Sequence, residues 1–322
     1  MATTSTKFEL KLGMATREAF GKALVALGKE NRDVVVCDAD LSKSTFTSLF
    51  HNEFPDRFFS CGIAEANMVA IGAGLAYAGK IPFVASFSSF VMNKGFEQLR
   101  CAVAYPGVNL KAVGTHSGIS IGEDGPSQMS IEETGLACSL PGFIVLSPAD
   151  EVSTMALIRA AGHHVGPVFG RMGRMKAPII YSADQKFEMG KAIQLIDGTD
   201  VTIMATGLLV AESIRAQATL AAEGISARVI DFHTIKPLDR EIIEKAASQT
   251  GAIVVAEEHL VDGGLGVRIA QVVAETHPCV MEFVGLTGYA ESASPEQLLD
   301  KYGMLARDVA AAARKVVSRK SQ

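Results

Sequence analysis

The feature of the sequence that most limits its possible folds is a regular alternation of two kinds of segment. Short apolar runs are separated by longer amphipathic segments, several of which begin near Ser, Thr or Asp residues that can cap a helix. Such alternation is typical of βαβ units and a mostly parallel sheet. It predicts strands at 33–38, 57–62, 81–87, 109–115, 143–148, 201–207, 225–232, 251–258 and 279–285.

A polar stretch near the middle of the chain interrupts this alternation. Residues 181–200 carry few apolar side chains and precede the second series of predicted strands. A chain of 322 residues is long enough for two cores of ordinary size. We therefore predict an α/β protein with two domains, 1–186 and 187–322, each a mostly parallel sheet flanked by helices.

The overall charge and the cysteines limit the class of protein and its surroundings. The formal net charge is -5 and 48% of the residues are hydrophobic, which favours a soluble globular protein and argues against nucleic acid or anionic membrane as a partner. The five cysteines show no CxxC spacing, which favours a reducing compartment. The start of the chain lacks a long apolar segment and the apolar run 68–79 is too short to cross a bilayer, so we expect a cytoplasmic protein.

Glu65 is the first candidate functional residue. It heads the segment 66–79, which is otherwise apolar or small and which we expect to pack on nearly every side. An acid at a helix start can simply complement the helix dipole. A carboxylate in such an apolar setting is costly unless it is paired or hydrogen-bonded, and a function that needs a desolvated acid explains Glu65 better.

Two further candidates lie where predicted strands end. Phe87 and Phe90 are three residues apart at the junction of a strand and a helix, where open α/β sheets bind ligands. Aromatic residues at this spacing are more often part of a core, but here they could also stack on a flat ring. His116 follows the next strand and opens the glycine-rich loop 114–133, whose length favours a functional role over an ordinary exposed turn. Its imidazole could donate or accept a proton, or contact an anion.

Several weaker signals suit anion or cofactor binding. Arginine side chains near strand ends or helix starts match the geometry of phosphate and carboxylate groups, although a solvated surface charge is the more common role for any one of them. The residues with these weaker signals are Arg17, Asp40, Ser44, Arg171 and Arg174.

Six motifs in order resemble the C-terminal half of transketolase, a thiamine diphosphate enzyme. They are TREAFGKAL, CDADLSKS, GIAEANMVAIGAGLA, SFSSFV, THSGISIGEDGPSQ and SLPGFIVLSPAD. The resemblance covers essentially the whole chain. It implies a pyrimidine-binding domain followed by a transketolase C-terminal domain, and the transfer of a two-carbon ketol unit between sugar phosphates, as in pentose phosphate chemistry.

The resemblance also implies roles for the cofactor-facing residues. Glu65 would be catalytic: it would hydrogen-bond a ring nitrogen of the aminopyrimidine and favour the imino tautomer, whose exocyclic nitrogen removes the thiazolium C2 proton. Phe87 and Phe90 would pack the pyrimidine ring, and Asp40 would help to place the cofactor.

A second set of residues would face the sugar substrate. His116 would be both catalytic and substrate-binding, and Asp124 would contact the hydroxyl group next to the reacting carbon. Gln128 stands where the family has another substrate histidine, which leaves the exact sugar open. Phosphate-binding roles would fall to Arg17, Ser44 and either Arg174 or Arg171, of which we favour Arg174.

One part of the family signature is missing from the sequence. No GDG is followed some thirty residues later by an Asn, the motif that holds Mg²⁺ and the diphosphate, so we assign no metal ligand to this chain. We predict that a separate N-terminal transketolase subunit carries these ligands, in an α2β2 heterotetramer in which this chain also pairs with itself, and that the chain is active only with that partner.

Two alternatives remain open at the level of sequence. Within the same superfamily the chain could be the β subunit of a 2-oxo acid dehydrogenase or part of a deoxyxylulose-phosphate synthase, although the GEDGP loop and the arginines favour sugar phosphates. In another class it could be a non-catalytic regulatory or scaffold subunit. The intact set of Glu65, Phe87, Phe90, His116 and Asp124 argues against that hypothesis.

Overall fold

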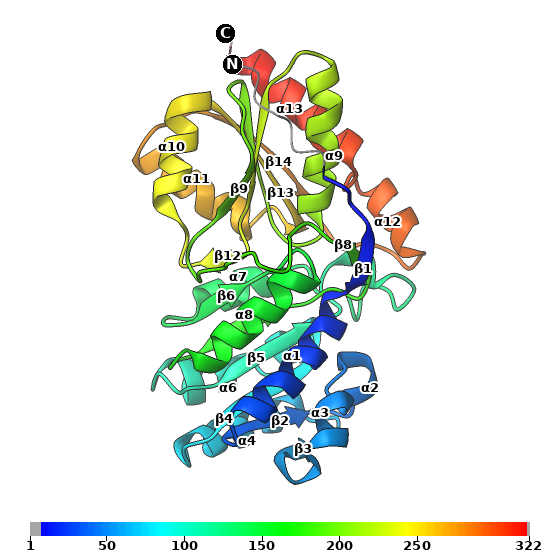
Figure 1. The fold of residues 1–322 in the computed structure, drawn as a ribbon, viewed down its shortest axis with the longest axis vertical. Helices are drawn as coiled ribbons and strands as arrows, with labels where there is room; N and C mark the ends of the chain where they lie inside the picture. The colour runs from blue at the N-terminus through cyan, green and yellow to red at the C-terminus, as the bar shows by residue number, and fades with distance from the viewer. Residues whose placement is uncertain (1–7, 321–322) are drawn as a thin grey trace.

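The chain forms two sheets of mostly parallel strands, each covered by helices on both faces (Figure 1). The structure, a computed structural model, describes residues 8–320. The predicted fold class is confirmed. No helix among the described residues is both long and apolar enough to cross a membrane.

The first sheet has the strand order β12-β6-β7-β5-β4-β2-β3, and only β12 runs antiparallel to its neighbour. Its strands are β2 (Val34–Asp38), β3 (Phe58–Ser60), β4 (Ile81–Phe87), β5 (Lys111–Thr115), β6 (Ile144–Leu146), β7 (Val168–Arg171) and β12 (Thr234–Lys236). The helical segments that accompany it are α1 (Thr16–Glu30), α2 (Ser42–Thr45), α3 (Ser48–Glu53), η1 (Pro55–Arg57), α4 (Glu65–Tyr77), α5 (Ser88–Asn93), α6 (Phe96–Gln98), η2 (Leu99–Ala104), η3 (Ile119–Ile121), α7 (Glu133–Ser139) and α8 (Glu151–His163).

The second sheet has the order β14-β13-β10-β11-β9, with β9 antiparallel. Its strands are β9 (Ile193–Ile196), β10 (Val201–Ala205), β11 (Ala227–Asp231), β13 (Ala252–Leu260) and β14 (Val280–Leu286). The helices that follow them are α9 (Leu209–Ala222), α10 (Arg240–Thr250), α11 (Leu265–Glu275), α12 (Pro295–Lys301) and α13 (Ala306–Lys320). A small antiparallel pair joins β1 (Leu12–Ala15) to β8 (Lys176–Pro178).

Burial on both faces explains the continuous apolar runs of the strands. In β4, Phe83 and Ala85 belong to the core beneath α1, whereas Val84 belongs to the core beneath α4. Successive strand residues point to opposite faces, so a strand covered on both sides is apolar at most positions, and its polar residues, such as Ser86 in β4, are buried as well. The same packing occurs in the second sheet, between the pair α9 and α13 and the pair α10 and α11.

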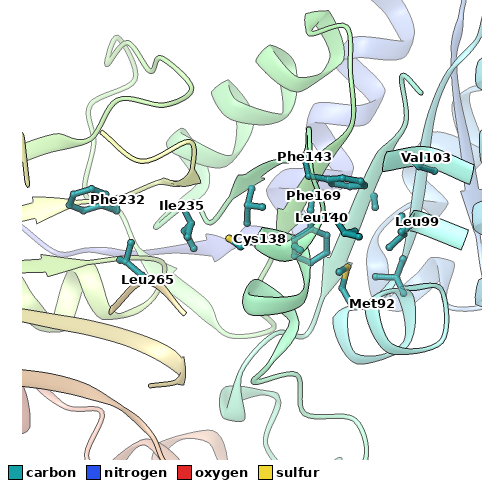
Figure 2. Packing of buried hydrophobic residues seen from close by; sticks show 14 of the residues in the cluster. Met92, Leu99, Val103, Cys138, Leu140, Phe143, Phe169, Phe232, Ile235 and Leu265 are labelled. Atoms are coloured by element: carbon teal, nitrogen blue, oxygen red, sulfur yellow. The ribbon is translucent and has the colours of Figure 1, made fainter. Parts of the chain in front are cut away.

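One apolar cluster runs through both parts of the molecule. Figure 2 shows Met92 and Leu99 beside the first sheet, Cys138 near the middle, and Phe232 and Leu265 beside the second sheet. The strand β12 reinforces this contact, because it follows β11 in the chain but pairs with β6 in the first sheet. The sequence did not predict β12. The boundary between residues 186 and 187 stays a prediction, and the polar stretch around it contains β9, which was also not predicted.

Candidate active site

The candidate residues gather at the carboxyl edge of the first sheet. Phe87 ends β4, His116 directly follows β5, and Arg174 lies just beyond β7. Glu65 opens α4, the helix that follows β3. Because the carboxyl ends of parallel strands share one edge, residues far apart in the sequence meet there.

Glu65 is a buried carboxylate with a half-exposed partner. The residue is 3% exposed and lies in the first turn of α4, where the helix dipole favours a negative charge. Its Oε2 lies 3.6 Å from Nζ of Lys94, whose side chain is 54% exposed. A ligand could take the place of Lys94 without disturbing the core. Lys94 was not predicted; it follows the last residue of α5, about one helical turn after Phe90.

A row of stacked rings connects Glu65 to His116. Nζ of Lys94 lies 4.5 Å from the ring centre of Phe90. The rings of Phe90 and Phe87 are nearly parallel with centres 5.6 Å apart, and the centre of the His116 ring lies 3.8 Å from that of Phe87. The predicted catalytic and aromatic residues therefore form one continuous row of contacts.

His116 is buried and fixed by two hydrogen bonds. Its Nε2 lies 3.1 Å from Nη1 of Arg17, and its Nδ1 lies 2.9 Å from Oγ1 of Thr115. Burial, and then the charges of Arg17 and Arg174, lower the pKa of His116 to about 3. The imidazole is therefore neutral at physiological pH.

Arg17 lies between His116 and the loop after β2. Its Nη1 donates a hydrogen bond of 2.7 Å to the carbonyl oxygen of Ser44, and its guanidinium carbon lies 5.2 Å from the ring centre of Phe46. Its Nε is buried without a hydrogen-bond partner among residues 8–320. Burial and the nearby charge of Arg174 lower the pKa of Arg17. Such an arginine is poised to bind an anion.

The backbone around this site adopts unusual conformations. Asp40, Phe46 and His116, with φ of 66°, 62° and 60°, are the non-glycine residues between 8 and 320 that have positive φ. Such conformations cost free energy and concentrate at functional sites. Phe46 also comes so close to α1 that a Cβ at Gly21 would lie 2.6 Å from its carbonyl oxygen, so the helix needs glycine there.

The loop after β2 is held by Asp38, and the cofactor-placing role of Asp40 stays a prediction. The buried Asp38 carboxylate accepts hydrogen bonds from the amide of Leu41 at 2.6 Å and from the hydroxyls of Thr45 and Thr47, both at 2.8 Å. Asp40 itself is exposed, and Ser44 is half-buried. Asp38 is the last residue of the buried strand β2. That position in the sequence could have identified it as the residue that holds the loop.

The remaining candidates lie in the loop 114–133 or contact it. Nη1 of Arg174 donates to the carbonyl oxygen of Ile121 and to the Glu123 carboxylate, the latter at 3.0 Å, while its side chain stays 35% exposed. Asp124 is exposed and close enough to Arg17 to raise its pKa, which opposes the effect of burial. Gln128 is half-buried, and its carbonyl oxygen accepts a hydrogen bond of 3.0 Å from Ser89.

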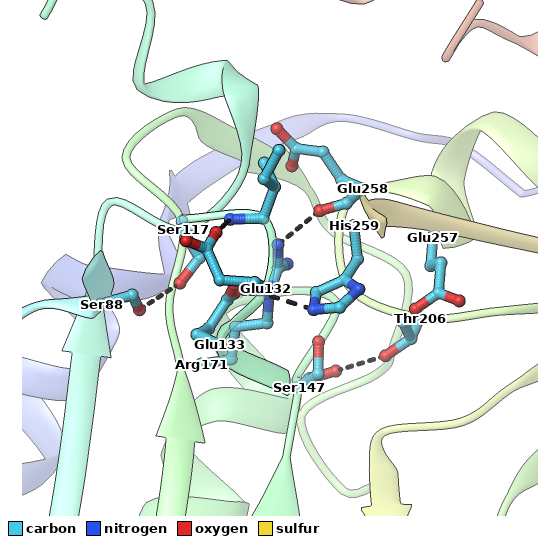
Figure 3. A network of polar contacts seen from close by, with 12 residues as sticks. Ser88, Ser117, Glu132, Glu133, Ser147, Arg171, Thr206, Glu257, Glu258 and His259 are labelled. Atoms are coloured by element: carbon cyan, nitrogen blue, oxygen red, sulfur yellow. Dashed lines mark hydrogen bonds and ion pairs between the residues drawn. The ribbon is translucent and has the colours of Figure 1, made fainter. Parts of the chain in front are cut away.

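Arg171 belongs to a different environment, a polar network between the two sheets (Figure 3). Its Nε donates to Oε1 of Glu133 at 2.5 Å, and its Nη2 donates to the carbonyl oxygen of Glu258 at 2.6 Å. The side chain is only 7% exposed. Of the two candidate arginines, Arg174 therefore lies beside His116, whereas two nitrogens of Arg171 are engaged by buried partners.

The same network fastens the loop 114–133 to the second sheet. Oε1 of Glu258, on β13, accepts a hydrogen bond of 2.6 Å from the amide of Ser120. Three residues further along the loop, the carbonyl oxygen of Glu123 accepts a hydrogen bond of 2.6 Å from the hydroxyl of Ser292, which follows β14. The second sheet thus helps to hold His116 and its neighbours in place.

The arrangement fits the aminopyrimidine half of thiamine diphosphate. A flat heteroaromatic ring needs an apolar wall and a hydrogen-bonding group at its edge, and the Phe87 and Phe90 rings and the buried Glu65 carboxylate supply these. No cluster of three or more His, Cys, Asp or Glu residues suited to a metal ion occurs between residues 8 and 320.

Two family models match consecutive parts of the chain. The family described as transketolase, pyrimidine binding domain, matches residues 13–179, and the family described as transketolase, C-terminal domain, matches residues 190–309.

Individual relatives differ in how much of their length matches. The "Putative transketolase C-terminal section" of Methanocaldococcus jannaschii is 41% identical over 299 residues, which cover 91% of this chain and 93% of that one. The "6-deoxy-6-sulfo-D-fructose transketolase subunit SqwH" of Clostridium sp. strain MSTE9 is 37% identical over 316 residues, 98% of each chain. By contrast, the chain spans only 50% of the mouse Transketolase-like protein 2.

A solved structure is similar over nearly the whole chain. It is described as "Split gene transketolase, inactive beta4 tetramer", it is 46% identical, and it superposes with a TM-score of 0.90 over 96% of this chain and 100% of its own.

Proposed function

The chain belongs to the transketolase family, and from that premise we propose that it is one subunit of a split, thiamine-diphosphate-dependent transketolase that transfers a two-carbon ketol unit between sugar phosphates. The observation that carries the proposal is the unbroken line of contacts from Glu65 through Lys94, Phe90 and Phe87 to His116. This line joins the residues needed for the cofactor to those needed for the sugar.

Each residue has a defined task in this proposal. Bound thiamine diphosphate supplies the carbanion-stabilising chemistry for breaking and forming a carbon–carbon bond next to a ketone. Glu65 shares a proton with the pyrimidine ring, and Phe87 and Phe90 fix the plane of that ring. Arg174, with Arg17 beside it, binds the phosphate of the sugar.

A partner subunit supplies Mg²⁺ and the diphosphate ligands. The relatives that match along their full length support this part of the proposal, since one is described as a C-terminal section and another as a subunit. Free thiols at all five cysteines suit the cytoplasm, which we propose as the location.

The exposed face of α4 supports a partner on this side of the molecule. From Ala66 to Ala78 the sequence has no charged residue, yet Tyr77 is 68% exposed and Ile63, just before the helix, is 78% exposed. A helix that is apolar all round is normally buried, and exposed apolar patches mark interaction sites. Because this helix begins at Glu65, we propose that the diphosphate-binding subunit covers it.

Substitution of an exposed tyrosine tests this docking surface. Tyr77→Glu should abolish copurification with the partner, because it places a charge in the apolar patch. Tyr289→Glu is the matched control, since Tyr289 is 70% exposed outside this surface. Equal binding by both variants would show that α4 is not the docking face.

A substrate panel tests the reaction. The chain is copurified with its partner and supplied with thiamine diphosphate, Mg²⁺, and ketose phosphates, 6-deoxy-6-sulfofructose or 2-oxo acids as donors. We expect ketol transfer from a ketose phosphate to an aldose phosphate. Turnover of 2-oxo acids alone would instead assign the chain to the 2-oxo acid dehydrogenases. Transfer restricted to the sulfosugar would mean that the site recognises a sulfonate group and not a phosphate group.

A further inference from the structure

The hydrogen bonds of His116 determine which of its ring nitrogens carries the proton. A guanidinium group can only donate hydrogen bonds. Because Nη1 of Arg17 lies 3.1 Å from Nε2 of His116, this nitrogen must accept, and the proton of the neutral ring is therefore on Nδ1. Nη1 donates its second hydrogen to the carbonyl oxygen of Ser44 at 2.7 Å, so both hydrogens of Nη1 have an acceptor.

Thr115 completes this set of hydrogen bonds. Its hydroxyl lies 3.3 Å from the carbonyl oxygen of Ser86, to which it donates, so its oxygen is free to accept the Nδ1 proton of His116 at 2.9 Å. The opposite assignment would point an Nε2–H at Arg17 and leave two donors 3.1 Å apart. Only this arrangement gives an acceptor to the Nη1 hydrogens of Arg17, to the ring proton of His116 and to the Thr115 hydroxyl.

The rest of the environment keeps the ring neutral and still. Thr115 and His116 are both buried, and Phe87 stacks on the imidazole with ring centres 3.8 Å apart. The cations Arg17 and Arg174 face the ring, and with burial they lower the pKa of His116 to about 3. No substrate is needed to set the orientation of the ring.

We propose that Thr115 is a positioning residue that holds His116 protonated on Nδ1, so that Nε2 accepts a hydrogen bond from a substrate hydroxyl that takes the place of Arg17. The identity of the substrate as a sugar rests on the proposed function. The state of the ring does not.

This arrangement also selects the class of substrate. An ionised carboxylate has only acceptor oxygens, and so it cannot replace Arg17 at a nitrogen that itself accepts. A polyhydroxylated compound can, and its phosphate can then bind the released guanidinium. The site therefore favours a hydroxylated sugar phosphate over a 2-oxo acid.

Nitrogen NMR of the chain alone tests the state of the ring. In protein labelled with ¹⁵N-histidine, we expect the His116 signals, identified by their loss in His116→Gln, to be of the protonated type at Nδ1 and the unprotonated type at Nε2. The Nδ1 proton should be protected from solvent exchange. Thr115→Ser should keep this protected proton because it keeps the hydroxyl, and Thr115→Val should lose it.

Kinetics of the assembled enzyme test the positioning role. Thr115→Val should lower kcat about tenfold, because a misplaced group costs this much or more. KM for the phosphorylated acceptor should change little, since Arg174 is unaffected. Thr115→Ser should stay within about twofold of the wild-type kcat, and equal melting temperatures of the two variants exclude a general loss of fold.

The possible outcomes distinguish a failure of the proton assignment from a failure of the positioning role or of the proposed function. Protonation of wild-type His116 on Nε2, or of both nitrogens at neutral pH, would overturn the inference and leave the proposed function intact, and this measurement needs no variant that might fail to fold. A wild-type kcat in Thr115→Val would overturn the positioning role. If the ring is protonated on Nδ1 but the assembled enzyme does not act on sugar phosphates, the proposed function fails while the assignment of the proton stands.

Discussion

Two clusters of charged residues at the carboxyl edge of the first sheet differ in how their charges are satisfied. In the polar network between the two sheets, Arg171 is buried against Glu133, which is also buried. In the candidate active site, two functional charges have exposed partners: Lys94 for Glu65, and Glu123 for Arg174. A charge whose partner is buried stabilises the fold, whereas a charge whose partner is exposed can exchange that partner for a ligand.

The largest expected effect separates Glu65 from Glu133. Glu65→Gln preserves the shape of the side chain but cannot share a proton with the cofactor, so we expect turnover of the assembled enzyme to fall about a thousandfold, within the range of general acid–base catalysis. Its melting temperature should remain close to that of the wild type. Steady-state kinetics and thermal unfolding measure both quantities.

Glu133→Gln is the matched control for this prediction. It should lower the melting temperature, because it removes the charge that pairs with the buried Arg171. Near-normal exchange of the C2 proton of bound thiamine diphosphate in the assembled Glu65→Gln enzyme would show that another residue is the required acid.

The second prediction concerns stability. Arg171→Met leaves the Glu133 carboxylate buried without its cation, so the free energy of unfolding should fall by about 3–5 kcal/mol. Adding Glu133→Leu should recover most of that loss, because an apolar pair can replace a buried ion pair. Denaturant unfolding of the two variants provides the comparison. A loss of less than about 1 kcal/mol in Arg171→Met would mean that the network does not hold the two sheets together.

The third prediction concerns Arg174. A charge-assisted bond to phosphate contributes about 1.5–3 kcal/mol, so Arg174→Ala should raise KM for phosphorylated acceptors about tenfold to a hundredfold. Unphosphorylated acceptors should be almost indifferent to the change, and the stability should be unaltered. Equal losses for both kinds of acceptor would remove the phosphate-binding role from Arg174.

The smallest effect is expected from Asp231, a buried acid beside Tyr181 and Asp150. Burial, with a contribution from Asp150, raises the pKa of Asp231 to about 8, although the hydrogen bond of 2.5 Å from Tyr181 opposes the shift. The folded protein therefore holds this proton more tightly than the unfolded chain. Its contribution to stability is complete below about pH 4 and is lost as the pH rises to about 8.

Asp231→Asn removes this titration. Between pH 5 and pH 8.5 the melting temperature of the wild type should change by about a few degrees more than that of the variant. Parallel curves for the two proteins would show that Asp231 is ionised in the folded state throughout this range.

The sequence predicted the local elements better than the long-range contacts. The strand predicted at 81–87 is β4 without change, because the run is apolar apart from Ser86 and lies between Gly79 and Ser88. The strand β12 was missed because three residues give no periodic signal and because its partner β6 lies far back in the chain.

The same limit applies within the candidate site. Arg171 and Arg174 look alike in the sequence, since what distinguishes them is Glu133 and Glu258, 38 and 87 residues away from Arg171. Lys94 was missed because a lysine on a helix is usually a solvated charge, and only the fold brings it to Glu65. Contacts of this kind depend on how the strands are ordered in the sheet.

The most direct test of the account is a titration of this chain with its proposed partner. Ketol transfer is measured in the presence of thiamine diphosphate and Mg²⁺, first with this chain alone and then with increasing amounts of a chain that carries the GDG motif. Glu65→Gln serves as a competitor that should bind the partner normally and inhibit when added in excess. We expect no turnover by the chain alone and saturation at equal amounts of the two subunits, whereas robust ketol transfer by the isolated chain would contradict the split-enzyme proposal.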